Sequence, residues 1–243
     1  MSAGCVGTAR AALDATVEHV TTRRQFGRAI GAFRATQAHL AWMAGRVHAM
    51  DAIVRSVGVE HARGASIETL SSIAKVFTSE SAFAVCDRAL QLHGALGFLE
   101  TTGVARMLRD CRITRIFEGA NDVLLVRLGA ARLASRGSST PVRHALLGPL
   151  ASGIEEAVAD LRARLGLSVM QKQLILQRVA KAEIALQVGL IAYDGSPIGR
   201  YAAEQLVEEG ERALDDLGSA ESEEETVDQI ASLLYEARAT SRS

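Results

Sequence analysis

Proline is missing from the first 140 residues of this 243-residue chain, and this gap limits what the chain can fold into. The prolines stand at Pro141, Pro149 and Pro197. A proline inside a helix removes a backbone donor and clashes with the preceding turn, so a long stretch without one suits uninterrupted helices. Runs of alternating β-branched residues, which would indicate strands, are also missing. The sequence therefore predicts an all-α protein.

Apolar residues three to four positions apart indicate where the helices lie. In the first helix this spacing places Val6, Ala9, Leu13, Val17 and Val20 along one face. The glutamate-rich residues 219–225 are expected to form a solvated acidic loop. Helices are predicted at residues 3–22, 35–63, 66–93, 101–109, 121–135, 142–165, 170–192, 197–217 and 225–240.

The strongest domain boundary lies in residues 136–141, where glycine, serines and proline cluster. The charge balance changes sign there. The first 140 residues hold 17 Lys and Arg against 11 Asp and Glu, and the remainder holds 10 against 17, which recovers the totals of 27 and 28. We therefore predict one helical domain at residues 1–137 and a smaller helical domain at residues 138–243.

Composition also bears on ligands and location. The positive first part suits a phosphate-bearing ligand, although chance and arginines at helix ends account for it equally well. Cys5, Cys86 and Cys111 show no metal-ligand spacing and are odd in number, so we expect buried, reduced thiols and no metal site. No apolar run approaches the ~18 residues of a membrane span, and no secretory signal is visible. The default expectation is a cytoplasmic protein without a nucleic-acid partner.

The stretch from Arg112 to Leu125 carries the most promising chemistry. Glu118 directly follows Ile116 and Phe117, and if that pair is buried the carboxylate lies against apolar surface, as a general base for a weak carbon acid requires. Gly119 lets the backbone bend and a flat ligand approach closely. Asn121 or Asp122 is expected to cap the following helix. The alternative is an exposed glutamate in an ordinary turn between helices.

Two further segments have conformations that a ligand could use. The first helix ends in Arg23-Arg24-Gln25-Phe26-Gly27, and basic residues followed by glycine also occur at ordinary helix ends. The third long helix ends at His93-Gly94-Ala95-Leu96-Gly97-Phe98, where two glycines three apart mark a tight turn with an accessible backbone.

These segments together resemble the C-terminal part of an acyl-CoA dehydrogenase. Residues 23–27 resemble the family's R-x-x-F-G stretch, and residues 91–98 resemble its Q-x-x-G-G-x-G-F turn. Arg109-Asp110 followed by residues 115–119 resembles its R-D and I-[FY]-E-G-T catalytic loop. The F-E-G-x-N-D form of that loop, and the stretch at residues 173–178, are similar to the very-long-chain branch. The resemblance implies a four-helix-type bundle followed by a smaller helical domain.

The resemblance also implies roles for individual residues. Family members remove hydrogens from the α and β carbons of acyl-CoA thioesters in fatty-acid β-oxidation, with FAD as cofactor. Glu118 would be the catalytic base that takes the α proton, and Arg23 would reach the FAD pyrophosphate of a neighbouring subunit. The other residues implied to contact FAD are Gln25, Phe26, Gln91, Gly94 and Ala95.

Several departures from the family pattern affect what the chain does alone. Ala120 replaces a threonine whose hydroxyl contacts flavin, and Ala95 replaces the second glycine of the turn. The family's N-terminal helical and middle β domains are absent from this sequence. The expected partners are therefore acyl-CoA, a second copy or a chain that carries the missing domains, and an electron-transfer flavoprotein as electron acceptor. The alternative is a non-catalytic helical partner that oligomerises with a full-length dehydrogenase.

Overall fold

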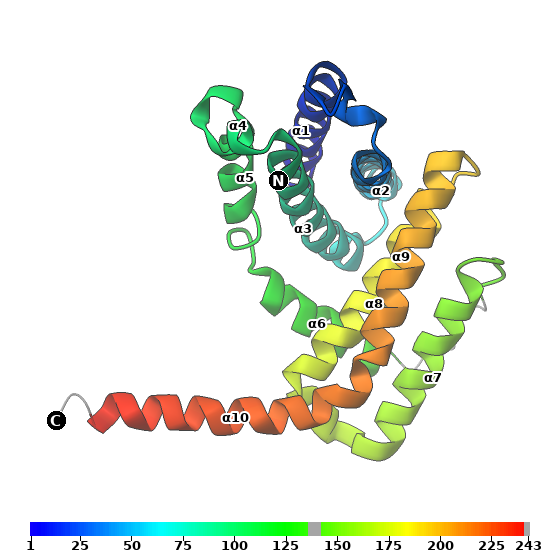
Figure 1. Ribbon diagram of the computed structural model, residues 1–243. Coiled ribbons are helices and arrows are strands. Elements are labelled where there is room, and N and C mark those ends of the chain that lie inside the picture. The colour runs from blue at the N-terminus through cyan, green and yellow to red at the C-terminus, as the bar shows by residue number, and fades with distance from the viewer. Residues whose placement is uncertain (136–141, 241–243) are drawn as a thin grey trace. The chain divides into compact units, whose positions relative to one another are not determined.

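The computed structural model describes residues 1–135 and 142–240 (Figure 1). Within these ranges the chain consists of α-helices, short 3₁₀ turns, loops and one two-stranded hairpin, which confirms the all-α prediction. The domain boundary predicted between residues 137 and 138 lies outside the described residues, so it stays a prediction.

The chain forms two compact units, each built from two stretches of sequence. The first comprises Met1–Leu124 and Gln187–Leu206, and the second comprises Leu125–Leu186 and Val207–Ser243. The elements up to residue 113 are α1 Ser2–Thr22, β1 Arg24–Gln25, β2 Arg28–Ala29, η1 Ile30–Ala32, α2 Arg34–Ala62, α3 Glu68–His93, α4 Ala95–Phe98, η2 Glu100–Thr102 and α5 Val104–Ile113. They are followed by α6 Asn121–Ala134, α7 Gly148–Leu165, η3 Gly166–Gln171, α8 Gln173–Ala192, α9 Pro197–Asp215 and α10 Leu217–Thr240.

Helix α3 is the central element of the first unit, because it packs against α1, α2 and α5. The buried face of α1 is formed largely by small residues, among them Ala9, Ala12 and Thr16, which allow α1 and α3 to approach closely. The predicted apolar face is therefore partly wrong: Leu13 is only half-buried and Val17 is 43% exposed. The side chains of α1 that are buried against α3 are therefore mostly small.

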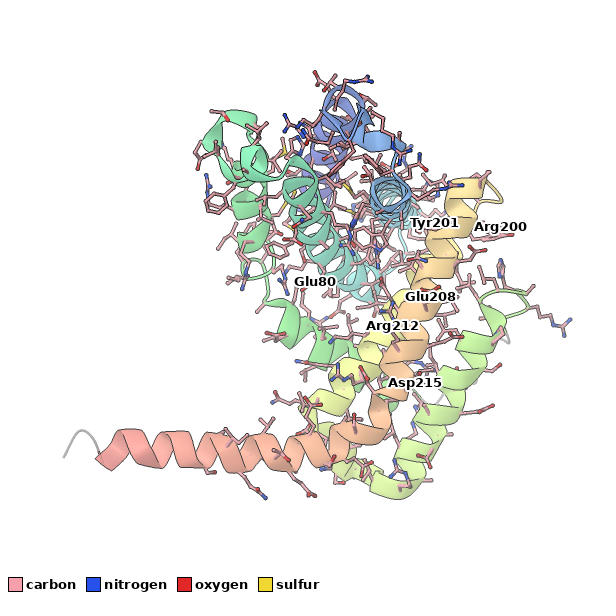
Figure 2. The ribbon with its side chains drawn as sticks, viewed as in Figure 1. Glu80, Arg200, Tyr201, Glu208, Arg212 and Asp215 are labelled. Carbon is pink, nitrogen blue, oxygen red and sulfur yellow. The ribbon has the colours of Figure 1, made fainter. Side chains whose placement is uncertain are left out.

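Helix α2 covers another side of α3 with large apolar side chains, including Met43, Met50 and Ile53, which are fully buried. The first turns of α9 also belong to this unit. A Cβ atom on Gly45 would lie 3.2 Å from Cδ1 of Tyr201, whose side chain is labelled in Figure 2. Glycine at position 45 therefore allows this close contact.

The second unit combines an apolar core with charged groups at helix ends. The Arg132 guanidinium pairs with Glu155 at 2.5 Å and with Glu183 at 3.1 Å. Arg162 donates hydrogen bonds to the carbonyl oxygens of Leu133 (2.9 Å) and Ser135 (2.5 Å). The last carbonyls of a helix lack partners within the helix, so Arg162 satisfies the C-terminal end of α6.

The acidic segment is helical, so the prediction of a solvated loop at residues 219–225 is wrong. These residues lie in α10, and the carboxylates of Glu221, Glu223 and Glu224 have partners in the same unit. Glu221 pairs with Arg164 at 2.9 Å, and Glu224 accepts a hydrogen bond from the backbone N–H of Leu174 at 2.5 Å. That N–H lies at the beginning of α8, where the first amides of a helix need an acceptor.

We predict that Gly129→Ala destabilises the protein by about 1–3 kcal/mol, because the helices cannot separate freely to admit a methyl group. A Cβ atom at position 129 would lie 2.0 Å from the carbonyl oxygen of Leu176. The matched control is Gly58→Ala in α2, where a Cβ atom meets nothing within 4 Å, and where alanine should stabilise the helix by about 0.5–1 kcal/mol. Urea denaturation measures both changes, and equal stability of the two variants would contradict the packing described.

Candidate functional site

The loop between α5 and α6 has a defined backbone conformation. The amide of Ile116 donates to the carbonyl oxygen of Ile113 (2.9 Å), and the amide of Asn121 donates to that of Arg115 (3.0 Å). Glu118 lies in the left-handed region with φ +54°, and Gly119 follows with φ +101°. A left-handed glutamate is uncommon and costs of order 1–3 kcal/mol, so other interactions must impose it.

Side chains of α3 supply those interactions. Lys75, Ser79 and Glu80, which we call the α3 clamp, lie within about one and a half turns of each other. The Lys75 ammonium donates to the carbonyl oxygen of Gly119 (2.5 Å) and to Oδ1 of Asn121 (2.6 Å). Nδ2 of Asn121 donates to Oγ of Ser79 (2.9 Å) and to Oε1 of Glu80 (2.7 Å). Asn121 is thus held from both ends of its amide.

Glu80 also holds the beginning of the loop. Nε of Arg115 donates to Oε1 of Glu80 at 2.9 Å, so one carboxylate oxygen receives hydrogen bonds from residues on both sides of Glu118. Figure 2 labels Glu80 on α3 near the segment that joins α5 to α6. The clamp therefore fixes the loop at Arg115, Gly119 and Asn121, and Glu118 lies between these points.

The clamp changes the role that the sequence suggested for Asn121. Its side chain is 5% exposed and is engaged with α3, so it does not cap α6. The first helical hydrogen bond runs from the amide of Leu124 to the carbonyl oxygen of Ala120. Asp122 is exposed in the first turn, where a negative charge favours the helix dipole.

The condition stated for Glu118, burial of Ile116 and Phe117 beside it, is not met within this chain. Glu118 is exposed, and its neighbours Ile116 and Phe117 are 52% and 41% exposed. Polar groups of the loop face α3, so the apolar side chains point away from it. Ile113 and Val123 are also exposed, at 50% and 65%, so the loop is surrounded by uncovered apolar side chains of the kind that bind a partner or ligand.

Residues 24–29 form a hairpin directly after α1, where the sequence suggested a helix end. Arg24 pairs with Ala29 and Gln25 pairs with Arg28, while Phe26 (φ +51°) and Gly27 (φ +79°) make the connection. Two consecutive residues with positive φ are typical of a type I′ turn. The Phe26 side chain is 91% exposed at the tip, and Arg23 and Gln25 are also exposed.

The glycine turn follows directly after α3. Gly94 has φ +60° and donates its amide to the carbonyl oxygen of Gln91, and Gln91 itself is exposed. A Cβ atom on Gly97 would lie 2.7 Å from the carbonyl oxygen of Leu90, so this position requires glycine. Ala95 begins α4 without a positive φ, so alanine is tolerated in place of the family's second glycine.

A pair of stacked histidines joins the ends of α1 and α3. The rings of His19 and His93 have centroids 4.4 Å apart and an interplanar angle of 21°. His93 is buried, and its Nδ1 lies 2.8 Å from the carbonyl oxygen of Ala89. Because the hairpin follows α1 and the glycine turn follows α3, the stack brings these two motifs to one end of the bundle.

The loop of Glu118 lies elsewhere along α3. It is held by Lys75 and Glu80, whereas the glycine turn begins after His93. At 1.5 Å per residue these positions are about 20–27 Å apart along the helix axis. The structure therefore brings Arg23, Gln25 and Phe26 toward the turn but separates this group from Glu118.

The structure also bears on the other expectations from composition. Cys5, Cys86 and Cys111 are buried free thiols, as predicted, and the sulfur atoms of Cys86 and Cys111 lie 3.6 Å apart. Among the described residues, no three His, Cys, Asp or Glu side chains are grouped so that they could hold a metal ion. Over the same part of the chain, no helix combines the length and apolar character needed to cross a membrane.

A match to a family model decides the family. Residues 1–133 match the model described as acyl-CoA dehydrogenase, C-terminal domain. The chain belongs to the acyl-CoA dehydrogenase family. The matched range includes the hairpin, the glycine turn and the loop of Glu118, whereas the stretch at residues 173–178 lies outside it.

Individual relatives agree with this assignment. The mitochondrial very long-chain specific acyl-CoA dehydrogenase of Rattus norvegicus is 36% identical over 172 residues, which cover 69% of this chain. The chain spans 26% of the length of that relative. The similarity to the very-long-chain branch, which the loop and the residues after it suggested, is thereby confirmed.

Solved structures show the same fold. Butyryl-CoA dehydrogenase from Megasphaera elsdenii is 35% identical and has a TM-score of 0.53. The match covers 54% of the present chain and 34% of the butyryl-CoA dehydrogenase chain. An acyl-CoA dehydrogenase from Bacillus anthracis, solved in complex with FAD, has a TM-score of 0.68. The match covers 98% of the present chain and 50% of the Bacillus anthracis chain. At 21% identity, the second structure supports the fold alone.

We predict that His19 makes the stability of the protein depend on pH. Burial, together with the nearby His93 and Arg23, lowers the pKa of His19 below 6.5. As the pH falls below about 6.5, the unfolded chain binds a proton at this position before the folded chain does, so stability decreases. Urea denaturation at about pH 7.5 and about pH 5.5 should show this decrease.

The variant His19→Gln should lose less stability on acidification than the unmodified protein. The control His61→Gln replaces an exposed histidine of α2 and should leave the decrease as it was. If His19→Gln loses as much stability between the two pH values as the unmodified chain, His19 does not titrate as described.

Proposed function

We propose that this chain supplies the catalytic base and part of the FAD site of an acyl-CoA dehydrogenase acting in fatty-acid β-oxidation. The observation that carries the proposal is the conformation of Glu118. It is a glutamate in the left-handed region, held between three points fixed by the α3 clamp, inside the range that matches the family model. Strained backbone held in this way is typical of functional sites.

Glu118 would accept the proton from the α carbon of an acyl-CoA thioester. Such a proton is weakly acidic, and its removal requires a carboxylate within hydrogen-bond distance in a site that excludes water. Bound FAD would accept the hydride that leaves the β carbon, which completes the α,β double bond. The exposed side chains of Ile116 and Phe117 would be covered by substrate and by parts of the assembly outside this chain, and this covering would exclude water from the carboxylate.

The other predicted site residues are suited to hold FAD. Arg23 offers an exposed cationic group for the pyrophosphate, and Gln25 and Phe26 lie beside it in the hairpin. At the same end of the bundle, Gly94 and Ala95 present backbone to the adenosine portion, and the exposed Gln91 precedes them. We propose this arrangement on the family resemblance and on the exposure of these groups.

The distance between the two sites supports a role for this chain in an oligomer. Glu118 and the hairpin lie far apart along α3, so we propose that they serve different FAD molecules, one of them bound mainly by a neighbouring subunit. The complete site would then need residues beyond one copy of this chain. We further propose an electron-transfer flavoprotein as electron acceptor and a cytoplasmic location.

The test is Glu118→Gln in the complete, FAD-loaded dehydrogenase that contains this chain. Mixing with acyl-CoA bleaches the flavin absorbance, and loss of the base should slow this bleaching by about 10²–10⁴-fold. Because glutamine has nearly the same shape, acyl-CoA and FAD affinities should stay close to those of the unmodified assembly.

The matched control is Asp122→Asn, which neutralises an exposed carboxylate four residues away. Its bleaching rate should equal that of the unmodified assembly. Rapid bleaching by Glu118→Gln would mean that another group is the base, and it would favour the non-catalytic helical partner as the role of this chain.

A further inference from the structure

Lys75 occupies an unusual place for a lysine. The residue is 7% exposed, and its sequence neighbours Ile73, Ala74, Val76 and Phe77 are all buried. Moving an ammonium group out of water is costly unless the group finds hydrogen-bond acceptors, so a buried lysine in an apolar helix needs specific partners. Lys75 finds such partners in the loop of Glu118.

Both hydrogen bonds from Lys75 go to this loop. One acceptor is the carbonyl oxygen of Gly119, the residue directly after Glu118, and the other is Oδ1 of Asn121 at the beginning of α6. The cluster around Asn121 then connects to Glu80, which holds Arg115 on the other side of Glu118. The loop is therefore attached to α3 both before and after the glutamate.

The backbone of Glu118 depends on these attachments. In isolation a glutamate avoids φ +54°, because its Cβ atom comes close to the following carbonyl oxygen. The apolar side chains of the loop do not impose this conformation, since Ile116 and Phe117 are largely exposed. The polar contacts of the α3 clamp impose it together with the hydrogen bond from the Asn121 amide to the Arg115 carbonyl oxygen, which closes the loop.

We propose that Lys75 is a positioning residue for proton abstraction, which holds the Gly119 carbonyl and Asn121 so that the Glu118 carboxylate points in one direction. The inference deepens the proposed function, because it rests on Glu118 acting as the base. Lys75 does not touch the substrate in this account. It acts through the backbone of the residue that does.

Electrostatics agree with this geometry. Burial lowers the pKa of Lys75, and the carboxylates of Glu80 and Glu118 oppose that decrease. The ammonium therefore interacts favourably with the Glu118 carboxylate as well as with the backbone beside it. An uncharged side chain of similar length at position 75 would remove both effects.

The first experiment measures flavin bleaching in the complete, FAD-loaded dehydrogenase that contains this chain. Lys75→Met keeps an unbranched side chain that is one atom shorter, and it removes the charge and the donors. A small displacement of a catalytic group can cost about 10²-fold in rate, so bleaching should slow by about 10–100-fold while acyl-CoA affinity changes little. Lys181→Met, at an exposed lysine of α8, is the matched control and should bleach at the unmodified rate.

A double variant separates positioning from a general effect on structure. If Lys75 acts through Glu118, Lys75→Met should slow bleaching much less in a Glu118→Gln background than in the unmodified one, because the base is already lost. Equal slowing in both backgrounds would overturn the positioning role. Rapid bleaching by Lys75→Met together with slow bleaching by Glu118→Gln would overturn it too, and would leave the proposed function intact.

Rapid bleaching by Glu118→Gln would instead overturn the proposed function, and with it the premise of this inference. In case Lys75→Met does not fold, a milder second variant is available. Ser79→Ala removes the hydroxyl that accepts from Asn121 and leaves the ammonium in place. It should slow bleaching severalfold, and an unchanged rate would count against control of the loop by the α3 clamp.

Amide hydrogen exchange in the 243-residue chain gives a readout that needs no cofactor. In Lys75→Met the amides of Ile116 and Asn121, which close the loop, should exchange faster, while amides of α1 keep their protection. Unchanged exchange at Ile116 and Asn121 would show that the loop keeps its shape without Lys75 and would overturn the proposal.

Discussion

The buried ammonium of Lys75 is the interaction on which the arrangement of this molecule most depends. A charge inside an apolar helix interface is tolerated only when its acceptors are in place, so the fold of the first unit and the shape of the loop stabilise each other. The acceptors are the Gly119 carbonyl, which belongs to the loop, and Asn121, the buried first residue of α6. Packing of α3 within the bundle thereby determines the backbone conformation of the proposed base.

Helix α3 positions two sites in this account. Its middle part, from Lys75 to Glu80, holds the loop of Glu118, and its end leads into the glycine turn, which the histidine stack places beside the hairpin. A rigid helix between the two fixes their distance at about 20–27 Å. This spacing explains why one chain would contribute a base to one flavin site and phosphate-binding groups to another.

Helix positions could be predicted from sequence because they depend on local periodicity and on the absence of proline. The three motifs were also found in the sequence, but their conformations could not be predicted.

The acidic residues of α10 were assigned to a loop because their partners, such as Arg164, lie far away in the sequence. Lys75 was overlooked for the same reason: its acceptors are 44 and 46 residues away. The one signal near Lys75 in the sequence was that apolar residues stand on both sides of it. The sequence left open whether Glu118 is buried, and it is exposed because the loop turns its polar backbone, not its apolar side chains, toward α3.

The rate at which an amine-reactive acetylating reagent modifies each lysine tests the central claim most directly. In the folded 243-residue chain, Lys75 should react far more slowly than the exposed Lys181, because its ammonium is buried and bound to Gly119 and Asn121. In concentrated urea the two lysines should react at similar rates. Equal rates at Lys75 and Lys181 in the folded chain would contradict the account, since the ammonium would then be free in solvent and the loop unheld.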